Sequence, residues 1–451
     1  MNVIRQISKR IFDILFHERI KRNLLQGIPF WIASFLTALV AVAFTKMFNF
    51  SEGVLKNALE WNRWTIFILA PTGFFLAWFV VYFFAKNARG SGIPQVMAAI
   101  ELTSPKYNST VDKLLSLKII IIKIASSLLM VVGGGAIGRE GPTIQIAGSV
   151  FRLVNKWTPK SWPKLSRQSF ILTGGAAGLA AAFNTPLGGV VFAIEELAKI
   201  HIRFFRTALF SAVIIAGLTA QGILGPYLYL GYPEVRNLHL SIFFGVAATA
   251  IIAGIGGSFM GKTILAMMKL KKSFSKLKAV LYVVGSGLVF ALIAYFLNPD
   301  ILGSGKDIMN SVLFTPEKHG TWDTGVLRIA GPIISFNTGA AGGVFAPALA
   351  AGASIGSYIS NLFDVMGSNA NILILSGMVG FLTGITRTPF TSAILVLEMT
   401  DRHNVIFHLM LAAMISNLAA LLVDKHSFYE QLKKGYLEES IAEKEKVVPD
   451  T

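Results

Sequence analysis

The 451-residue sequence contains no cysteine, so disulfides, thiol nucleophiles and thiolate metal sites are excluded. Charge is also scarce: 14% of the residues are Asp, Glu, Lys or Arg, whereas a soluble domain carries about a quarter. Hydrophobic residues make up 53% of the chain. This balance predicts a protein whose surface meets lipid rather than water.

Signals for cofactors are also missing. The seven histidines show no ligand spacing on one helix face, and His403 and His408 do not share a face. The stretch GSGKD (303–307) falls short of a phosphate loop, which requires Gly in place of Asp300 and Ser or Thr in place of Asp307. The sequence therefore predicts no metal ion, no nucleotide and no other cofactor.

Long uncharged runs dominate the sequence. A helix needs roughly 17 to 25 residues to cross a hydrocarbon core of about 30 Å. Gly and Pro interrupt several of the runs, as in LTGGAAGLAAAFNTPLGG (172–189). Backbone inside a membrane must be helical or shielded by protein, so these interruptions predict broken helices in an all-α polytopic membrane protein. The runs that are long enough, or nearly so, are 27–45, 64–85, 168–194, 207–233, 240–261, 279–299, 329–363, 366–386 and 404–423.

The distribution of charge predicts the orientation of the chain. The net charge is +17, but the basic residues are spread over linkers, which argues against nucleic-acid binding. Linkers 152–167 and 262–278 carry Lys and Arg without any acid, so they are expected on the cytoplasmic side, together with both termini. Residues 1–27 begin with alternating basic and apolar residues. They are predicted to form an amphipathic helix on the membrane surface rather than a secretory signal.

An internal repeat divides the apolar region. Segments 172–196 and 375–399 align at a constant offset of 203 residues, with a Thr-Pro pair at 185–186 and at 388–389. Thr followed by Pro is typical of a helix start, so each half contains a helix that restarts inside its apolar segment. We therefore expect a first half at 28–236, a second, inverted half at 237–424, and a cytoplasmic helix and tail at 425–451.

A glycine-rich break precedes each Thr-Pro pair: GREGP (138–142) in the first half and GGVFAP (342–347) in the second. The helix from Pro142 to about Lys156 is roughly 22 Å long and ends in a basic cytoplasmic linker, so it must begin inside the membrane. Its free N–H groups and positive dipole end attract an anion there. Glycine allows the close approach of backbone to that anion, although Gly133–Gly135 are explained equally well by helix packing.

Arg139 and Glu140 are ionisable residues within this apolar region, and such residues are usually functional. A mutual ion pair is the simpler alternative, but adjacent helical residues do not face one another. A carboxylate at the positive end of a helix takes the place of an anion. Glu140 is therefore predicted to compete with a permeant anion and to be released when it is protonated.

Three more acids and one lysine are candidates for a role. Glu195 and Glu398 are repeat counterparts, which favours a shared structural role. Glu196 corresponds to Met399, so it is an acid in one half only and is the better candidate for a proton relay. A solvated helix end is the alternative for Glu196. Lys123 lies deep in an apolar run and is a candidate charge partner of the GREGP glutamate or of the anion path.

Taken together, the motifs resemble those of the CLC family of chloride channels and chloride/proton exchangers. The resemblance covers about 28–435 and implies an inverted-repeat fold of many tilted and broken helices, and a homodimer with one anion pathway per subunit. It implies transport of chloride and protons through the lipid bilayer, and no enzyme activity. The motifs, in the order of the family, are GSGIP (90–94), GREGP (138–142), FNTPLGGVVFAIEEL (183–197), GGVFAP (342–347) and ILVLEMT (394–400).

The resemblance also implies roles for single residues. By position, Glu140 resembles the gating glutamate of the family, and Glu196 its inner proton-transfer glutamate. Ser in GSGIP, where nitrate-selective relatives have Pro, implies chloride, and fluoride exchangers depart from both GSGIP and GREGP. The chain after residue 429 is too short for the regulatory domains of many eukaryotic members, which implies a bacterial inner membrane. The implied chloride-binding positions are Ser91, the N–H groups of Val344 and Phe345, Tyr429 in HSFYEQL, Arg139 and Gly141.

The predicted function is secondary active exchange of chloride for protons. A passive chloride channel of the same fold is the alternative. Such channels keep an acid at the position of Glu140 but commonly lack one at the position of Glu196. An intramembrane hydrolase is disfavoured, because such an enzyme needs an activated serine with a histidine, and GSGIP, GREGP and GGVFAP contain no histidine.

Overall fold

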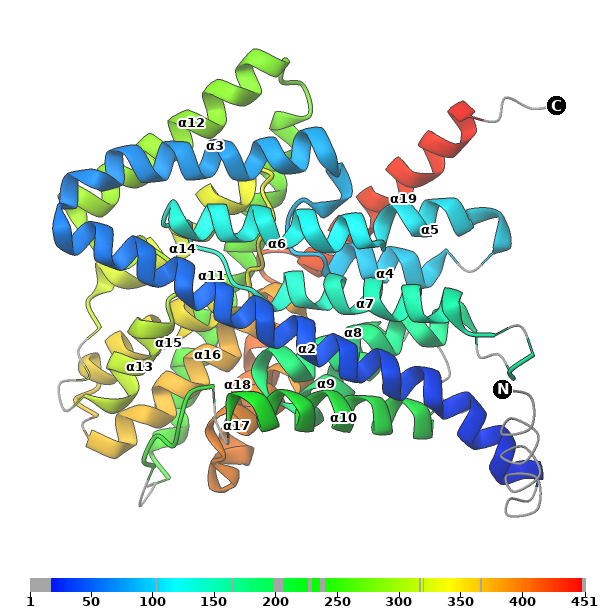
Figure 1. The fold of residues 1–451 in the computed structure, drawn as a ribbon. Coiled ribbons are helices and arrows are strands. Elements are labelled where there is room, and N and C mark those ends of the chain that lie inside the picture. The colour runs from blue at the N-terminus through cyan, green and yellow to red at the C-terminus, as the bar shows by residue number, and fades with distance from the viewer. Residues whose placement is uncertain are drawn as a thin grey trace.

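The computed structural model describes residues 18–102, 104–159, 161–163, 166–197, 206–225, 229–235, 240–315, 318, 320–365 and 367–447. Every regular element in these ranges is a helix (Figure 1). The principal helices are α2 (Glu18–Trp61), α3 (Ile66–Phe84), α4 (Ile93–Glu101), α5 (Asn108–Leu114), α6 (Leu117–Val132), α7 (Glu140–Trp157), α8 (Arg167–Phe183), α9 (Pro186–Phe192), α10 (Arg206–Leu224), α11 (Ile242–Lys271), α12 (Lys276–Leu292), α13 (Lys306–Phe314), α14 (Trp322–Asn337), α15 (Phe345–Leu362), α16 (Ala370–Thr386), α17 (Pro389–Thr400), α18 (Ile406–Ala420) and α19 (Phe428–Val447).

Eight helical segments in the described residues are long and apolar enough to cross a membrane. The run predicted at 168–194 is broken into α8 and α9, and the run at 329–363 into α14 and α15. The predicted runs do not include α6, because Lys118 and Lys123 interrupt its apolar sequence. The fold is therefore the predicted all-α membrane architecture with broken helices, plus one helix that the search for uncharged runs does not detect.

The N-terminal boundary differs from the prediction. Helix α2 runs without a break from Glu18 to Trp61 and contains Pro29. The predicted boundary between a surface helix and the membrane region, at residue 27, therefore falls inside one helix. The first part of that surface helix, residues 1–17, lies outside the described residues.

The internal repeat is visible in the helices. Helix α16 begins and ends 203 residues after α8, and each is followed by a residue in the left-handed conformation, Asn184 (φ 57°) and Arg387 (φ 63°). Helices α7 and α15, which follow the two glycine-rich breaks, both have 18 residues. The two halves thus share a backbone plan, as the repeat in the sequence predicts.

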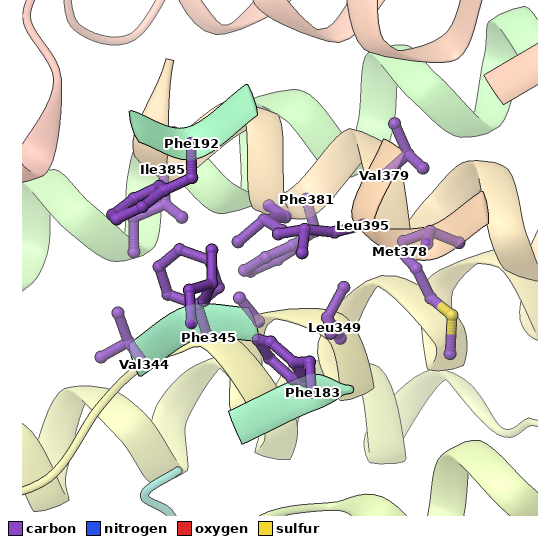
Figure 2. Close-up of a cluster of buried hydrophobic side chains, with 14 of the residues drawn as sticks. Phe183, Phe192, Val344, Phe345, Leu349, Met378, Val379, Phe381, Ile385 and Leu395 are labelled. Atoms are coloured by element: carbon purple, nitrogen blue, oxygen red, sulfur yellow. The ribbon is translucent and has the colours of Figure 1, made fainter. Parts of the chain in front are cut away.

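Aromatic side chains from both halves meet in the core. Figure 2 shows Phe183 and Phe192 of the first half beside Phe345 of the second. The ring of Phe345 lies 6.3 Å from that of Phe183 and 6.4 Å from that of Phe192. Because this cluster joins α8, α9 and α15, it fixes the start of α15 against the first half.

Candidate functional site

Three glycine-rich motifs that are far apart in the sequence are joined by backbone hydrogen bonds. Gly138 and Gly343 exchange two N–H···O bonds of 2.8 Å. Gly90 donates to Ala340 at 2.8 Å and accepts from Gly342 at 3.1 Å. These bonds bring together the starts of α4, α7 and α15, all within buried protein. Helix starts carry N–H groups without intrahelical acceptors, so the region is rich in donors.

Close contacts explain why glycine is required here. A Cβ at Gly141 would lie 2.2 Å from the hydroxyl oxygen of Ser91, and one at Gly138 would lie 2.3 Å from Oε2 of Glu140. Gly92 has a φ of 103°, which other residues rarely adopt. GSGIP and GREGP therefore interlock, and the Ser91 side chain is directed at the first turn of α7.

Glu140 is the first residue of α7, and its side chain is buried, at 1% exposure. The backbone N–H groups of Glu140 itself and of Ala346, in the first turn of α15, point at its carboxylate. The hydroxyl of Tyr229 donates to Oε1 at 3.4 Å. The carboxylate therefore lies where two helix starts from different halves converge, which is where an anion is stabilised best.

Arg139, the other charged residue of GREGP, is directed elsewhere. Its guanidinium donates to Asn49 of α2 at 3.0 Å and lies 5.9 Å from the ring centre of Tyr229. Asn49 lines a cavity of about 820 Å³, together with Lys306 and Arg328. Arg139 thus lies between Tyr229, which contacts the buried carboxylate, and Asn49, which lines this cavity.

Ser91 and Tyr429 form the other side of the site. Both are buried, and the phenol of Tyr429 lies close enough to Ser91 to interact with it. Neither hydroxyl makes a hydrogen bond of normal geometry with the described residues. The Tyr429 ring stacks on Phe345 at 6.0 Å. Buried hydroxyl donors normally have partners, so this pair is suited to a ligand that accepts hydrogen bonds.

A smaller cavity of about 220 Å³ opens at Ser91 and is lined by Arg89, Lys271 and Tyr436, among others. Two cavities therefore approach the candidate site: the larger one is lined by Asn49, which accepts a hydrogen bond from Arg139, and the smaller one is lined by Ser91.

Glu196 belongs to a π-helical turn after α9 (Ala193–Leu197), and its side chain is buried. Tyr429 is electrostatically coupled to both Glu196 and Glu140. The structure therefore brings Glu140, Gly141, Ser91 and Tyr429 together with the start of α15 at Val344 and Phe345. The guanidinium of Arg139 is directed to Asn49 and Tyr229 instead, so Arg139 does not join this group.

Glu195 and Glu398 are repeat counterparts, and each caps the start of a helix in the opposite half. The carboxylate of Glu398 accepts from the N–H groups of Leu187 (3.0 Å) and Gly188 (2.7 Å) at the start of α9. Glu195 accepts from the N–H groups of Phe390 (3.2 Å) and Thr391 (2.6 Å) at the start of α17. The predicted shared structural role is thus visible as reciprocal capping between the halves.

The prediction that Lys123 is a charge partner of Glu140 is wrong. The fully buried ammonium of Lys123 donates to the carbonyl oxygens of Ala88 (2.9 Å) and Gly90 (2.7 Å). Ala88 ends a short 3-10 turn (Lys86–Ala88), whose last carbonyl groups have no donor within the turn, and Gly90 lies in the loop that follows. Lys123 therefore stabilises the loop that carries Ser91 through hydrogen bonds to the backbone just before Ser91.

Two contacts of the site lie outside all the motifs. Tyr229 and Asn49 touch Glu140 and Arg139, but both lie in segments without a repeat or a glycine pattern. Nothing in the sequence distinguishes them from other polar residues near an apolar run. No group of three or more His, Cys, Asp or Glu in the described ranges could hold a metal ion.

A family model described as "Voltage gated chloride channel" matches residues 72–421, which is most of the chain. The chain belongs to the voltage-gated chloride channel family. The matched region contains GSGIP, GREGP, GGVFAP and the two Thr-Pro helices, and it ends just before α19.

Named relatives in the voltage-gated chloride channel family are similar over nearly the whole chain. The H(+)/Cl(-) exchange transporters ClcA of Salmonella arizonae and Salmonella paratyphi B are each 27% identical over 431 residues, which is 90% of this chain and 88% of theirs. Among solved structures, a slow cyanobacterial Cl−/H+ antiporter has a TM-score of 0.80 at 22% identity, covering 92% of this chain and 98% of its own. A CLC-type fluoride/proton antiporter has a TM-score of 0.75 at 18% identity, covering 93% and 99%. These structures show that the fold is shared.

Proposed function

We propose that the protein exchanges chloride for protons across a membrane, with Glu140 as the gate. The observation that carries the proposal is the position of the Glu140 carboxylate, which lies at the starts of both α7 and α15. An ionised carboxylate and chloride are both stabilised by helix-start N–H groups, so they compete for the same place. Protonation removes the charge from the side chain and frees the place for chloride.

The chloride site adjoins the gate. The hydroxyls of Ser91 and Tyr429 and the N–H groups of Val344 and Phe345 are the donors we assign to it, with Gly141 leaving room for the Ser91 side chain. Chloride carries a single charge and has no directional preference. Hydroxyl and N–H dipoles bind it weakly enough for it to leave again, whereas a buried ammonium would retain it.

The proton route requires a second acid. Glu196 is buried and is coupled to Tyr429, which is coupled in turn to Glu140. We assign Glu196 as the acid that passes protons between Glu140 and the cytoplasm. Its presence favours exchange over a passive channel, because a channel does not need it. Transport of ions through dipoles and carboxylates also involves no covalent step, so we propose no enzyme activity.

The reversal potential of the current tests exchange directly. Purified protein is reconstituted into vesicles with equal chloride on both sides and a pH gradient. An exchanger shows a current that reverses away from zero, because protons are coupled to chloride. A reversal potential that follows the chloride gradient alone at every pH would favour a passive channel of the same fold.

We further propose that the molecule is a homodimer through the surface of α9, α10, α17 and α18, which lie together in Figure 1. This surface exposes apolar side chains such as Leu187 (59%) and Phe390 (55%), yet the half-buried carboxylates of Glu195 and Glu398 lie beside them. A carboxylate that faces lipid is costly, so we expect a second copy of the chain, rather than lipid, to cover this surface.

Because the chain has no cysteine, Leu187→Cys offers a single labelling point. Mixed donor and acceptor labels there should transfer energy between copies, and labels at Phe83→Cys should transfer less.

We also propose that α5, α19 and the end of α7 face the cytoplasm of a bacterial inner membrane. Lys113 pairs with Glu443 at 2.9 Å, and Arg152 pairs with Asp112 at 3.0 Å, so these elements share one end of the molecule (Figure 1). That end carries the basic linker 152–167, which the positive-inside rule assigns to the cytoplasm.

A further inference from the structure

Tyr229 reaches Glu140 from a segment that belongs to none of the motifs. It lies in the irregular stretch 229–235 between α10 and α11, and its side chain is buried, at 3% exposure. The next residue, Leu230, donates its N–H to the carbonyl of Met399 near the end of α17 at 3.2 Å. The segment is thus tied to the second half at the point where its tyrosine enters the site.

Three neighbours fix the orientation of the Tyr229 ring. The ring of Phe183 meets it edge to face at 5.0 Å. The ammonium of Lys306 lies 5.0 Å from the ring centre, and the guanidinium of Arg139 lies 5.9 Å from it. Cations favour the face of an aromatic ring, so these contacts do not depend on the hydroxyl. The hydroxyl is left directed at Oε1 of Glu140, at 3.4 Å.

We propose that Tyr229 is a positioning residue that holds the ionised Glu140 carboxylate in its place and so sets the proton concentration at which the gate opens. The proposal rests on the gating role proposed above. A hydroxyl that donates to a carboxylate favours the ionised form over the protonated form. Loss of the donor makes the carboxylate easier to protonate and easier for chloride to displace.

Other charged and titratable groups also lie near Glu140. Arg139 immediately precedes α7, Glu52 lies on α2 and Tyr429 belongs to α19, while Lys306 at the start of α13 packs on the ring of Tyr229. All of them remain when Tyr229 is replaced by phenylalanine, and the ring contacts remain as well. The substitution therefore isolates the contribution of one hydroxyl.

Tyr229→Phe should move the midpoint of the pH dependence of chloride flux to higher pH. A hydrogen bond to a charged group is typically worth a threefold to tenfold change in an equilibrium, which corresponds to roughly half to one pH unit. Chloride affinity measured by calorimetry at neutral pH should rise about threefold, because the competing carboxylate is held less strongly. Tyr232→Phe is the matched control: this tyrosine belongs to the same segment but is 58% exposed, and its loss should leave both measurements unchanged.

The same substitution in a Glu140→Gln background separates the two proposals. The amide does not ionise, so Tyr229→Phe should then change neither the pH dependence nor the chloride affinity by a measurable amount. If Glu140→Gln abolishes proton coupling but Tyr229→Phe alone leaves the pH midpoint in place, the positioning role is overturned and the gating role stands. If proton coupling survives Glu140→Gln, the gating role itself fails.

Discussion

The two halves of the molecule share three consecutive helices but differ in their chemistry. Helices α7, α8 and α9 have counterparts in α15, α16 and α17, down to the left-handed residue before each Thr-Pro pair. The first residue of α7 is Glu140, whereas the first residue of α15 is Phe345. Glu196 likewise corresponds to Met399. Both of the acids to which we assign proton chemistry therefore lie in the first half.

This difference separates two requirements. An anion needs donors from several directions, and a pair of similar halves supplies them because each half places helix starts near the centre. Protons need a titratable path, and one such path is sufficient. The second half contributes backbone N–H groups and apolar packing at the positions where the first half contributes carboxylates. The predictions below test this division.

The largest effect is expected from Glu140→Gln. This substitution removes the titratable group from the start of α7, so that α7, like α15, begins with a residue that cannot ionise. Proton transport should fall by at least about 100-fold, since the amide cannot exchange a proton. Chloride flux should persist and lose its pH dependence. Proton uptake by reconstituted vesicles measures this, and coupling that persists at the wild-type ratio would remove Glu140 from its assigned role.

Glu196→Gln removes the second acid that has no acidic counterpart in the other half of the molecule. We expect proton transport to fall by at least about tenfold while chloride flux continues, because Glu196 is not among the donors that we assign to chloride. Glu195→Gln is the neighbouring control and should leave proton transport intact. Parallel loss of chloride and proton flux in Glu196→Gln would indicate a structural residue instead.

Ser91→Ala tests a donor that the first half provides to the shared anion site. Removal of one hydroxyl donor to an anion should weaken chloride binding about tenfold. Tyr429→Phe should act in the same direction, and calorimetric titration with chloride measures both. Unchanged affinity in both variants would mean that chloride binds elsewhere in the chain.

The smallest effect is expected where the halves are most alike. Glu195→Ala and Glu398→Ala each remove a cap from a helix of the opposite half, and each should cost about 1–2 kcal/mol of stability. Thermal unfolding in detergent should give similar losses for the two variants. The exposed Glu60→Ala is the control for simple loss of charge. A large loss from only one of the two would show that the halves are not mechanically equivalent.

Much of the fold follows from local sequence. Thr-Pro pairs, left-handed residues and glycine-rich breaks act on their own neighbours, so the restart of α9 and α17 and the start of α7 are predictable. Helix α6 is not, because two lysines break its apolar run, and only the carbonyls of the loop before Ser91 explain how Lys123 is buried. Tyr229 gives no signal either, because the contact of its hydroxyl with Glu140, on which the proposed positioning role rests, arises only from the packing of the chain.

Composition and spacing were enough to show a membrane protein in two repeated halves, with helices that restart among apolar residues and with Glu140 and Glu196 lacking an acidic counterpart in the second half. Those properties depend on composition and on spacing along the chain. Tertiary structure alone decided that GSGIP, GREGP and GGVFAP share one set of hydrogen bonds, and that Glu195 and Glu398 cap opposite halves. Hydrogen bonds between residues about 200 positions apart depend on how the helices pack, which no local pattern encodes.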